Sequence, residues 1–343
     1  MSQSTPIEST TLAYTNPVYP SYFADPFVWE YQGVYYAIGT GEAEAEGEVD
    51  EAGEQRVFPL LRSHNLVDWQ AAGRAMLRPD TSLGNNFWAP EVAYWDGTFY
   101  LYYSVGHEDK NHQLRVATSD RPLGPYQDIG KPLLEAEPYP FAIDPHPFQD
   151  DNGQWYLFYA CDFLDTEGDA RAGTALMVDR LESMTKLAGE AKVVLRAHQD
   201  WQRFLENRPM YGGTYDWHTL EGASVRKHEG RYYCFYSGGR WETENYGVDY
   251  GVADQVMGPY SDAGNEAGPR VLRTVAHRVL GPGHNSIVLA PDRQTEYIVY
   301  HAWDTNRTAR RLCLDKLVWT PEGPRCNGPT WTPQMISMGN RNS

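Results

Sequence analysis

The sequence is organised by one phrase that recurs five times at intervals of 55 to 77 residues. Each copy joins a short apolar run, a turn, and a second run rich in Tyr and Phe. Turns such as Asp96-Gly97 and Asn152-Gly153 favour β-hairpins, because these residue pairs accept the positive φ angles of tight turns. The copies begin with ADPFV at Ala24, WAPEV at Trp88, IDPHP at Ile143, LEGAS at Leu220 and GHNSI at Gly283, and each continues through its turn and second run.

A further strand-like stretch follows most copies, so each unit holds three or four strands, and the third unit is the least regular. Repeated units of this kind predict an all-β fold, a single five-bladed β-propeller. The aromatic content of 13% agrees with many short strands. A helix is expected at most around Ser183 to Ala191.

We expect one domain over residues 16–343, preceded by a flexible N-terminal tail over residues 1–15. The acidic stretch 41–54 interrupts the first unit and is interpreted as a solvated loop, with cation binding or a lid as alternatives. The four cysteines do not have zinc-binding spacing, so we expect reduced and mostly buried thiols. They are Cys161, Cys234, Cys313 and Cys326.

Charge and hydropathy narrow the possible functions. A net charge of −17 excludes a dedicated nucleic-acid binder, which needs a basic face. No apolar run approaches the roughly 18 residues of a membrane span, so no membrane partner is expected. The first residues lack the features of a secretory signal, which predicts a cytoplasmic protein. The sequence has no Walker-type phosphate loop and no Gly-x-Ser-x-Gly motif, so nothing in it supports a kinase or an esterase.

In a propeller the innermost strands start around one mouth of the central channel, so equivalent residues of the copies should converge. Carboxylates held together shift one another's pKa values, which lets an acid and a base coexist near neutral pH. Two carboxylates across a pocket can cleave a glycosidic bond. An alternative is that Asp-Pro simply makes a good turn into a strand. The aligned positions are Asp25, Ala89, Asp144, Glu221 and His284.

Aromatic residues lie within a few positions of this expected ring. Trp88, Phe27 and Tyr215 are candidates to stack against a sugar, and packing between blades is the alternative for each. Arg310, in an arginine cluster beyond the fifth hairpin, is a further candidate for a sugar contact. A surface salt bridge is the alternative for that arginine.

Five phrases, ADPFV, NFWAPEV, IDPHPF, LEGASV and GPGHNS, resemble glycoside hydrolase family 43 in their order and spacing. The resemblance extends from Asn16 onward. It implies a five-bladed propeller that acts on arabinose- and xylose-containing glycans with inversion at the anomeric carbon. Sucrose- and fructan-cleaving propellers open on Asn-Asp-Pro-Asn, whereas this chain has Ala24-Asp25-Pro26-Phe27, so that interpretation is disfavoured.

The resemblance also implies roles for individual residues. Asp25 matches the family's general base, Glu221 its general acid, and Asp144 the carboxylate that orients the acid and raises its pKa. Inversion predicts a separation of ~6.5–9.5 Å between the Asp25 and Glu221 carboxyl groups, with room for a water. His284 matches a histidine that lies near a channel cation in many relatives. A calcium ion near His284 is therefore expected as an accessory, with no cofactor required for the chemistry.

These observations predict an exo-acting α-L-arabinofuranosidase whose partner is a pentose-containing oligosaccharide. Exo action is favoured because a cytoplasmic hydrolase meets imported oligosaccharides instead of polymer. A β-D-xylosidase and then an endo-1,5-α-L-arabinanase are the alternatives within the family. The alternative that is not an enzyme is a propeller that binds glycans without cleaving them.

Overall fold

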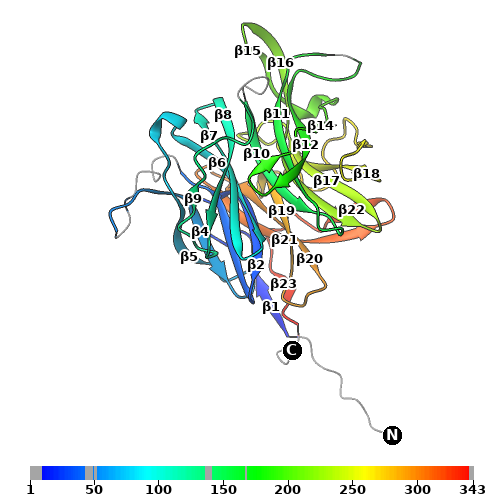
Figure 1. Cartoon of the computed structure of the whole chain (residues 1–343). Helices are drawn as coiled ribbons and strands as arrows, with labels where there is room; N and C mark the ends of the chain where they lie inside the picture. The colour runs from blue at the N-terminus through cyan, green and yellow to red at the C-terminus, as the bar shows by residue number, and fades with distance from the viewer. Residues whose placement is uncertain (1–9, 43–48, 50–51, 136–140, 167, 340–343) are drawn as a thin grey trace.

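The computed structural model describes residues 10–339 except 43–48, 50–51, 136–140 and 167. The predicted all-β fold class is confirmed (Figure 1). Helical structure in the described part of the chain is limited to two single 3-10 turns, Thr81–Leu83 and Asp200–Gln202. None of its helices is long or apolar enough to cross a membrane.

Three antiparallel sheets of four strands contain the first, second and fifth copies of the repeat among the described residues. The first sheet comprises β2 (Ala24–Tyr31), β3 (Val34–Thr40), β4 (Arg56–Ser63) and β5 (Gln70–Leu77). The second comprises β6 (Asn86–Trp95), β7 (Thr98–His107), β8 (Lys110–Ser119) and β9 (Gln127–Asp128). The last comprises β19 (Leu280–Leu289), β20 (Glu296–Trp303), β21 (Arg310–Thr320) and β22 (Gly323–Cys326).

The third and fourth copies share one larger sheet. The third group is β10 (Ala142–Gln149), β11 (Trp155–Phe163) and β12 (Gly173–Ser183), with β13 (Lys186–Leu187) and β14 (Lys192–Leu195) on β12. The fourth group is β16 (Gly213–His228), β17 (Arg231–Gly238) and β18 (Gly247–Ala253), with β15 (Arg203–Met210) on β16. A short parallel contact joins β12 to β16. The count of five blades therefore stays a prediction, because hydrogen bonding does not separate these two groups.

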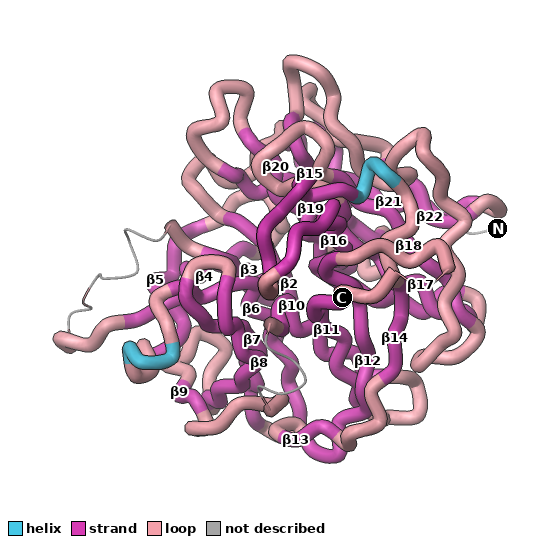
Figure 2. Tube along the Cα trace, turned by 90° about the horizontal axis from the view of Figure 1, so that it is seen from above, coloured by secondary structure: helices cyan, strands magenta, loops and turns pink. Residues whose placement is uncertain are grey.

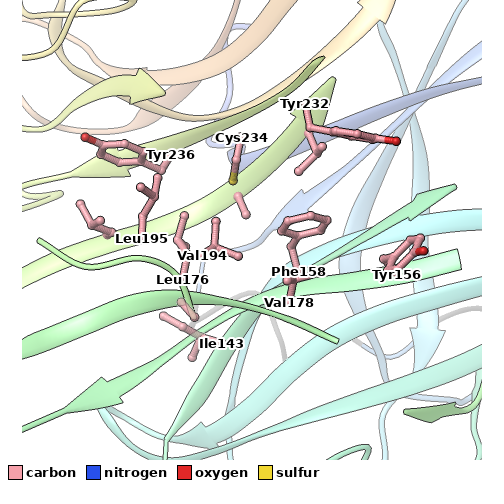
Figure 3. Packing of buried hydrophobic residues seen from close by; sticks show 14 of the residues in the cluster. Ile143, Tyr156, Phe158, Leu176, Val178, Val194, Leu195, Tyr232, Cys234 and Tyr236 are labelled. Atoms are coloured by element: carbon pink, nitrogen blue, oxygen red, sulfur yellow. The ribbon is translucent and has the colours of Figure 1, made fainter. Parts of the chain in front are cut away.

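The first strand of each group lies at the centre of the molecule (Figure 2). Successive innermost strands contact one another in cyclic order, β2 with β6, β6 with β10, β10 with β16, β16 with β19, and β19 with β2. These contacts close a ring around a central axis. Buried apolar clusters fill the spaces between neighbouring groups. Figure 3 shows one of them, where Phe158 and Leu176 of the third group meet Cys234 of the fourth.

Three sequence expectations differ from the structure or fall partly outside it. Strand β1 (Thr11–Tyr14) pairs with β23 (Gln334–Ser337), so strand structure begins inside the segment expected to be a tail. The helix expected around Ser183 to Ala191 is wrong, because β12 ends and β13 lies there. Much of the acidic stretch 41–54 lies outside the described residues. All four cysteines are free, and three are buried, as expected.

Each innermost strand carries a β-bulge at the same point, where two residues oppose one on the next strand. The first residue of every bulge has a positive φ, a conformation that costs energy for residues other than glycine. These φ values are 49° at Asp25, 44° at Ala89, 57° at Asp144, 60° at Gly222 and 48° at His284. The five copies therefore share one backbone conformation at this point of the strand, although the side chains there differ.

The bulge places Gly222, and not Glu221, at the ring position of the fourth copy. This corrects the expected alignment of Glu221 with Asp25 and Asp144. Glu221 pairs with Ser237 in the last register before the bulge, as Trp88 pairs with Ser104. The physical reason is the positive φ, which a glycine accepts without strain. Glu221 therefore lines the pocket from the position one residue before the bulge of its strand.

Four of the five bulge amides tie their group to the one before it in the ring. The amide of Ala89 donates to Thr40 Oγ1 at 2.9 Å, and that of Gly222 donates to Asp144 Oδ2 at 2.9 Å. The amide of His284 donates to Ser237 Oγ at 2.7 Å. The amide of Asp25 likewise donates to the group before it in the ring, because its acceptor is His301 Nδ1 of the fifth group at 3.1 Å. The same backbone kink thus positions the ring residues and joins neighbouring groups.

The Gly222→Ala variant is expected to lower the free energy of unfolding by about 1–2 kcal/mol, the cost of a left-handed residue with a Cβ. The added Cβ would also lie 3.1 Å from His284 Nδ1. Ala89→Gly is the matched control, because it removes a Cβ at a φ of 44° and is expected to leave stability unchanged or higher. Urea denaturation of both variants tests this. Equal stability of Gly222→Ala and the native protein would contradict the assigned strain.

Candidate active site

A pocket of about 280 Å³ opens where the bulges meet. It contains every predicted catalytic residue and most of the other predicted site residues. The predicted residues in its lining are Asp25, Trp88, Asp144, Glu221, His284 and Arg310. Its other lining residues are Tyr22, Thr40, Gly41, Asn86, Ile143 and Trp241. The structure therefore brings together side chains from all five copies of the repeat.

Two predicted sugar-stacking residues lie elsewhere. Phe27 follows the bulge of β2 and lines a separate cavity of about 390 Å³, toward the other end of the innermost strands. Its ring stacks on Trp29 at 6.1 Å. Tyr215 lines a surface pocket of about 660 Å³ beside His218. The structure does not bring Phe27 or Tyr215 into the carboxylate pocket, because the bulge turns Phe27 away and β16 carries Tyr215 beyond the pocket mouth.

Asp25 is buried next to a fixed positive charge. Arg310 Nη1 lies 3.2 Å from Asp25 Oδ1, and His284 Nδ1 lies 3.4 Å from the same oxygen. Burial is the largest single influence and acts to raise the pKa of Asp25, but Arg310, His284 and His301 together outweigh it and hold this pKa well below its usual range. Asp25 is therefore ionised at neutral pH. An ionised carboxylate of this kind can accept a proton from a water molecule.

The guanidinium of Arg310 is itself held by aromatic residues. Its Nη2 donates to the Tyr22 hydroxyl at 2.7 Å, and it lies 4.4 Å from the centre of the Trp241 ring. Trp241 stacks on Trp303 at 5.9 Å. Arg310 is only 8% exposed, so the contact to Asp25 is shielded from solvent. These contacts fix the orientation of the charge that keeps Asp25 ionised.

Glu221 has the opposite electrostatic environment. Burial raises the pKa of Glu221 to about 7, and the charge of Asp25 adds to this effect. The Tyr246 hydroxyl opposes it by donating a hydrogen bond to Glu221 Oε1 at 2.7 Å. Glu221 thus holds a proton up to about neutral pH, whereas Asp25 has lost its proton. One ionised and one protonated carboxyl group therefore line the same pocket.

Asp144 is the third carboxyl group of the pocket. Burial raises the pKa of Asp144 well above its usual range, and the charges of Glu221 and Asp25 add to the shift. The Gly222 amide donates to Asp144 Oδ2 at 2.9 Å and fixes its orientation directly beside Glu221. The two carboxyl groups are close enough to influence each other's ionisation. The expected role of Asp144, orienting the acid and raising its pKa, stays a prediction.

The environment of His284 does not fit a calcium ion. Its Nδ1 faces Asp25 at 3.4 Å and Asp144 at 3.9 Å, so the imidazole occupies the space between the two carboxylates. Calcium prefers six to eight oxygen ligands. The described residues contain no group of three or more His, Cys, Asp or Glu side chains that could hold a metal ion. Burial lowers the pKa of His284, so this side chain is a neutral neighbour of Asp25.

Sequence reasoning missed several residues that shape this pocket. Tyr246 reaches Glu221, and its ring stacks on His301 at 5.8 Å with an interplanar angle of 8°. Burial lowers the pKa of His301 to about 4, so its imidazole is neutral and its Nδ1 can accept a hydrogen bond from the Asp25 amide. Tyr246 lies outside the repeated phrases, and His301 lies in the second run of the fifth copy, where no motif distinguishes it. Gly222 was a usable signal, because glycine is the residue expected at a positive φ.

Tyr246→Phe is expected to raise the pKa of Glu221 above about 7, because the lost hydrogen bond stabilises the ionised carboxylate. The ring that stacks on His301 is retained. Carboxyl titration by NMR with ¹³C-labelled glutamate measures the shift. Tyr102→Phe is the matched control, since Tyr102 is fully buried and its hydroxyl donates to the Met184 carbonyl. A Glu221 pKa that is unchanged or lower in Tyr246→Phe would contradict this assignment.

Known proteins are similar to this chain in sequence and in fold. A β-D-galactofuranosidase from Aspergillus niger is 29% identical over 324 residues, covering 90% of this chain and 83% of the relative. An exo-α-(1→5)-L-arabinofuranosidase from Cellvibrio japonicus is 26% identical, covering 77% and 78%. The crystal structure of a thermostable family-43 glycoside hydrolase has a TM-score of 0.78 and 29% identity, covering 96% of this chain and all of that one. The family model described as glycosyl hydrolases family 43 matches residues 14–324, and the chain therefore belongs to this family of glycoside hydrolases.

Proposed function

We propose that the protein is an exo-acting α-L-arabinofuranosidase that removes single residues from arabinose-containing oligosaccharides with inversion. The observation that carries this proposal is the pairing of an ionised Asp25 with a protonated Glu221 in a pocket of about 280 Å³. A pocket of that volume suits one terminal sugar residue. The relatives also include proteins named as arabinofuranosidases and arabinanases.

In this mechanism Glu221 donates its proton to the glycosidic oxygen as the bond from that oxygen to the anomeric carbon breaks. Asp25 accepts a proton from a water molecule, whose oxygen forms the new bond on the opposite face. Arg310 keeps Asp25 ionised until the water arrives. After the reaction Asp25 holds a proton and Glu221 has lost one, so exchange with solvent restores the starting state.

A β-D-galactofuranosidase is a second candidate, because the relative from Aspergillus niger carries that name. The ring carbons of β-D-galactofuranose have the same configuration as those of α-L-arabinofuranose. The hexose differs only by a longer exocyclic chain. Proteins named xylosidase/arabinosidase are also similar to this chain, which keeps β-D-xylosidase as an alternative.

Turnover of three 4-nitrophenyl glycosides separates these activities. We expect the α-L-arabinofuranoside to have a higher kcat/KM than the β-D-xyloside and the β-D-galactofuranoside. Asp25→Asn is the blank and should abolish turnover. A preference for the galactofuranoside would favour the second candidate. ¹H NMR of the fresh product should show the inverted anomer, and a retained anomer would contradict the roles of Asp25 and Glu221.

The activity should fall as the pH rises through about 7, because Glu221 must be protonated to act as the acid. Activity should persist well below neutral pH, since the pKa of Asp25 is held low by Arg310. A pH profile of kcat/KM measures both limbs. Glu221→Gln should lower kcat by roughly 10²–10⁴ on substrates with poor leaving groups. If that variant still bound sugar and the native protein turned over no glycoside, a glycan-binding propeller would be favoured.

A further inference from the structure

A groove of about 560 Å³ lies outside the catalytic pocket, between two hairpin tips. One wall is residues 109–111, at the turn between β7 and β8. The other is residues 209–213, at the turn between β15 and β16. We call it the hairpin groove.

The β15–β16 hairpin is an extension of the fourth group. β16 has 16 residues, whereas the other innermost strands have 8 to 10. The interval from Asp144 to Glu221 is also the longest between aligned positions of the repeat, at 77 residues. Figure 1 shows β15 and β16 projecting beyond the neighbouring strands at the top of the molecule. The extension precedes Glu221 directly, so it rises from the pocket beside the acid.

The β7–β8 wall also begins at the pocket. Asn86, which lines the pocket, accepts the amide of Glu108 at 2.7 Å. Trp88, another lining residue, stacks on His112 at 3.8 Å. Asn86 pairs with Gly106, and Asp109 lies three residues farther, in the turn after β7, so the chain between them spans at most roughly 10 Å at about 3.3 Å per residue. The groove is therefore within reach of two or three sugar residues extending from the pocket.

Two contacts hold the hairpin tip in place. Arg208 Nη2 lies 2.7 Å from Asp109 Oδ2, which links the two walls. The Tyr211 hydroxyl donates to Asp162 Oδ2 at 2.7 Å, near the end of β11. Asp162 lies two residues beyond Ala160, which pairs with the pocket residue Ile143. These contacts tie the tip to the second and third groups, so the groove is formed before any ligand binds.

Tyr211 is an unusual residue for its position. It has a φ of 50° in the two-residue turn, where Asn, Asp or Gly is favoured. A side chain in that conformation carries strain, and strain of this kind gathers at functional sites. Its ring is 44% exposed although its hydroxyl is bonded. An aromatic face beside the polar groups of Lys110 and Asn111 suits a neutral sugar, whose C–H face stacks while its hydroxyls accept and donate hydrogen bonds.

We propose that the hairpin groove binds the leaving-group end of the oligosaccharide, the neutral pentose chain beyond the bond that is cleaved. This inference rests on the proposed function, because Glu221 protonates the leaving oxygen and the departing chain then lies along β16. Tyr211 is the stacking residue of this site. Substrates long enough to reach it gain affinity, while a short aryl glycoside gains none.

The test compares (1→5)-α-L-arabinotetraose with 4-nitrophenyl α-L-arabinofuranoside. Tyr211→Ala should raise KM and lower kcat/KM for the tetraose about tenfold, and should leave the aryl glycoside within about twofold. Tyr211→Phe should retain most of the tetraose activity, because the ring remains. Tyr94→Ala is the matched control, since Tyr94 is 43% exposed and lines the cavity at the other end of the strands. That variant should leave kcat/KM for both substrates unchanged.

If Tyr211→Ala lowers kcat/KM equally on both substrates, or on neither, the proposed binding role of the hairpin groove is overturned. Calorimetry of tetraose binding to Glu221→Gln, with and without Tyr211→Ala, separates this result from failure of the proposed function. Tyr211-dependent binding without turnover in the native protein would overturn the function and support the groove. Turnover of both substrates without any effect of Tyr211 would overturn the groove and support the function. If Tyr211→Ala does not fold, Asn111→Ala takes its place with the same expected split.

Discussion

The β-bulge at the start of each innermost strand is the constraint on which the rest of the structure depends. It frees one backbone amide per strand from the sheet, and a buried amide needs a partner. For Ala89, Gly222, His284 and Asp25 that partner is a side chain of the preceding group in the ring. The same kink turns the side chains of Asp25 and Asp144 into the pocket. Ring closure and site construction therefore share one backbone feature.

The chemistry of the pocket follows from how unequally its charges are distributed. Asp25 has Arg310 as a close partner, whereas burial dominates the pKa values of Glu221 and Asp144. Without Arg310, three carboxyl groups in one small pocket would all resist ionisation. Its guanidinium lies beside Asp25, which is the ionised one of the three. The aromatic residues around Arg310 matter because they hold that charge on Asp25.

The sequence predicted much of this arrangement because repeats report structural equivalence directly. Asp25, Asp144, His284 and Trp88 were placed at the pocket from their positions in the five copies, and they lie there. The error at the fourth copy arose because alignment by chemical type matched Glu221 to Asp25. Backbone conformation matches Gly222 instead, and periodicity does not report φ. Phe27 was misplaced for the same reason, since a bulge reverses the side of the strand that the next residue faces.

The sequence by itself determined the all-β class and the convergence of residues far apart in the chain, because hairpin patterns and their repetition are local signals. The tertiary structure alone decided which carboxyl group is ionised, since that depends on Arg310 and on burial contributed by other groups. It also brought Tyr246, which lies outside the repeat, to Glu221, and it brought His301 from the second run of the fifth copy to Asp25. Electrostatics and stacking act across space, and a pattern along the chain holds no record of which side chains meet.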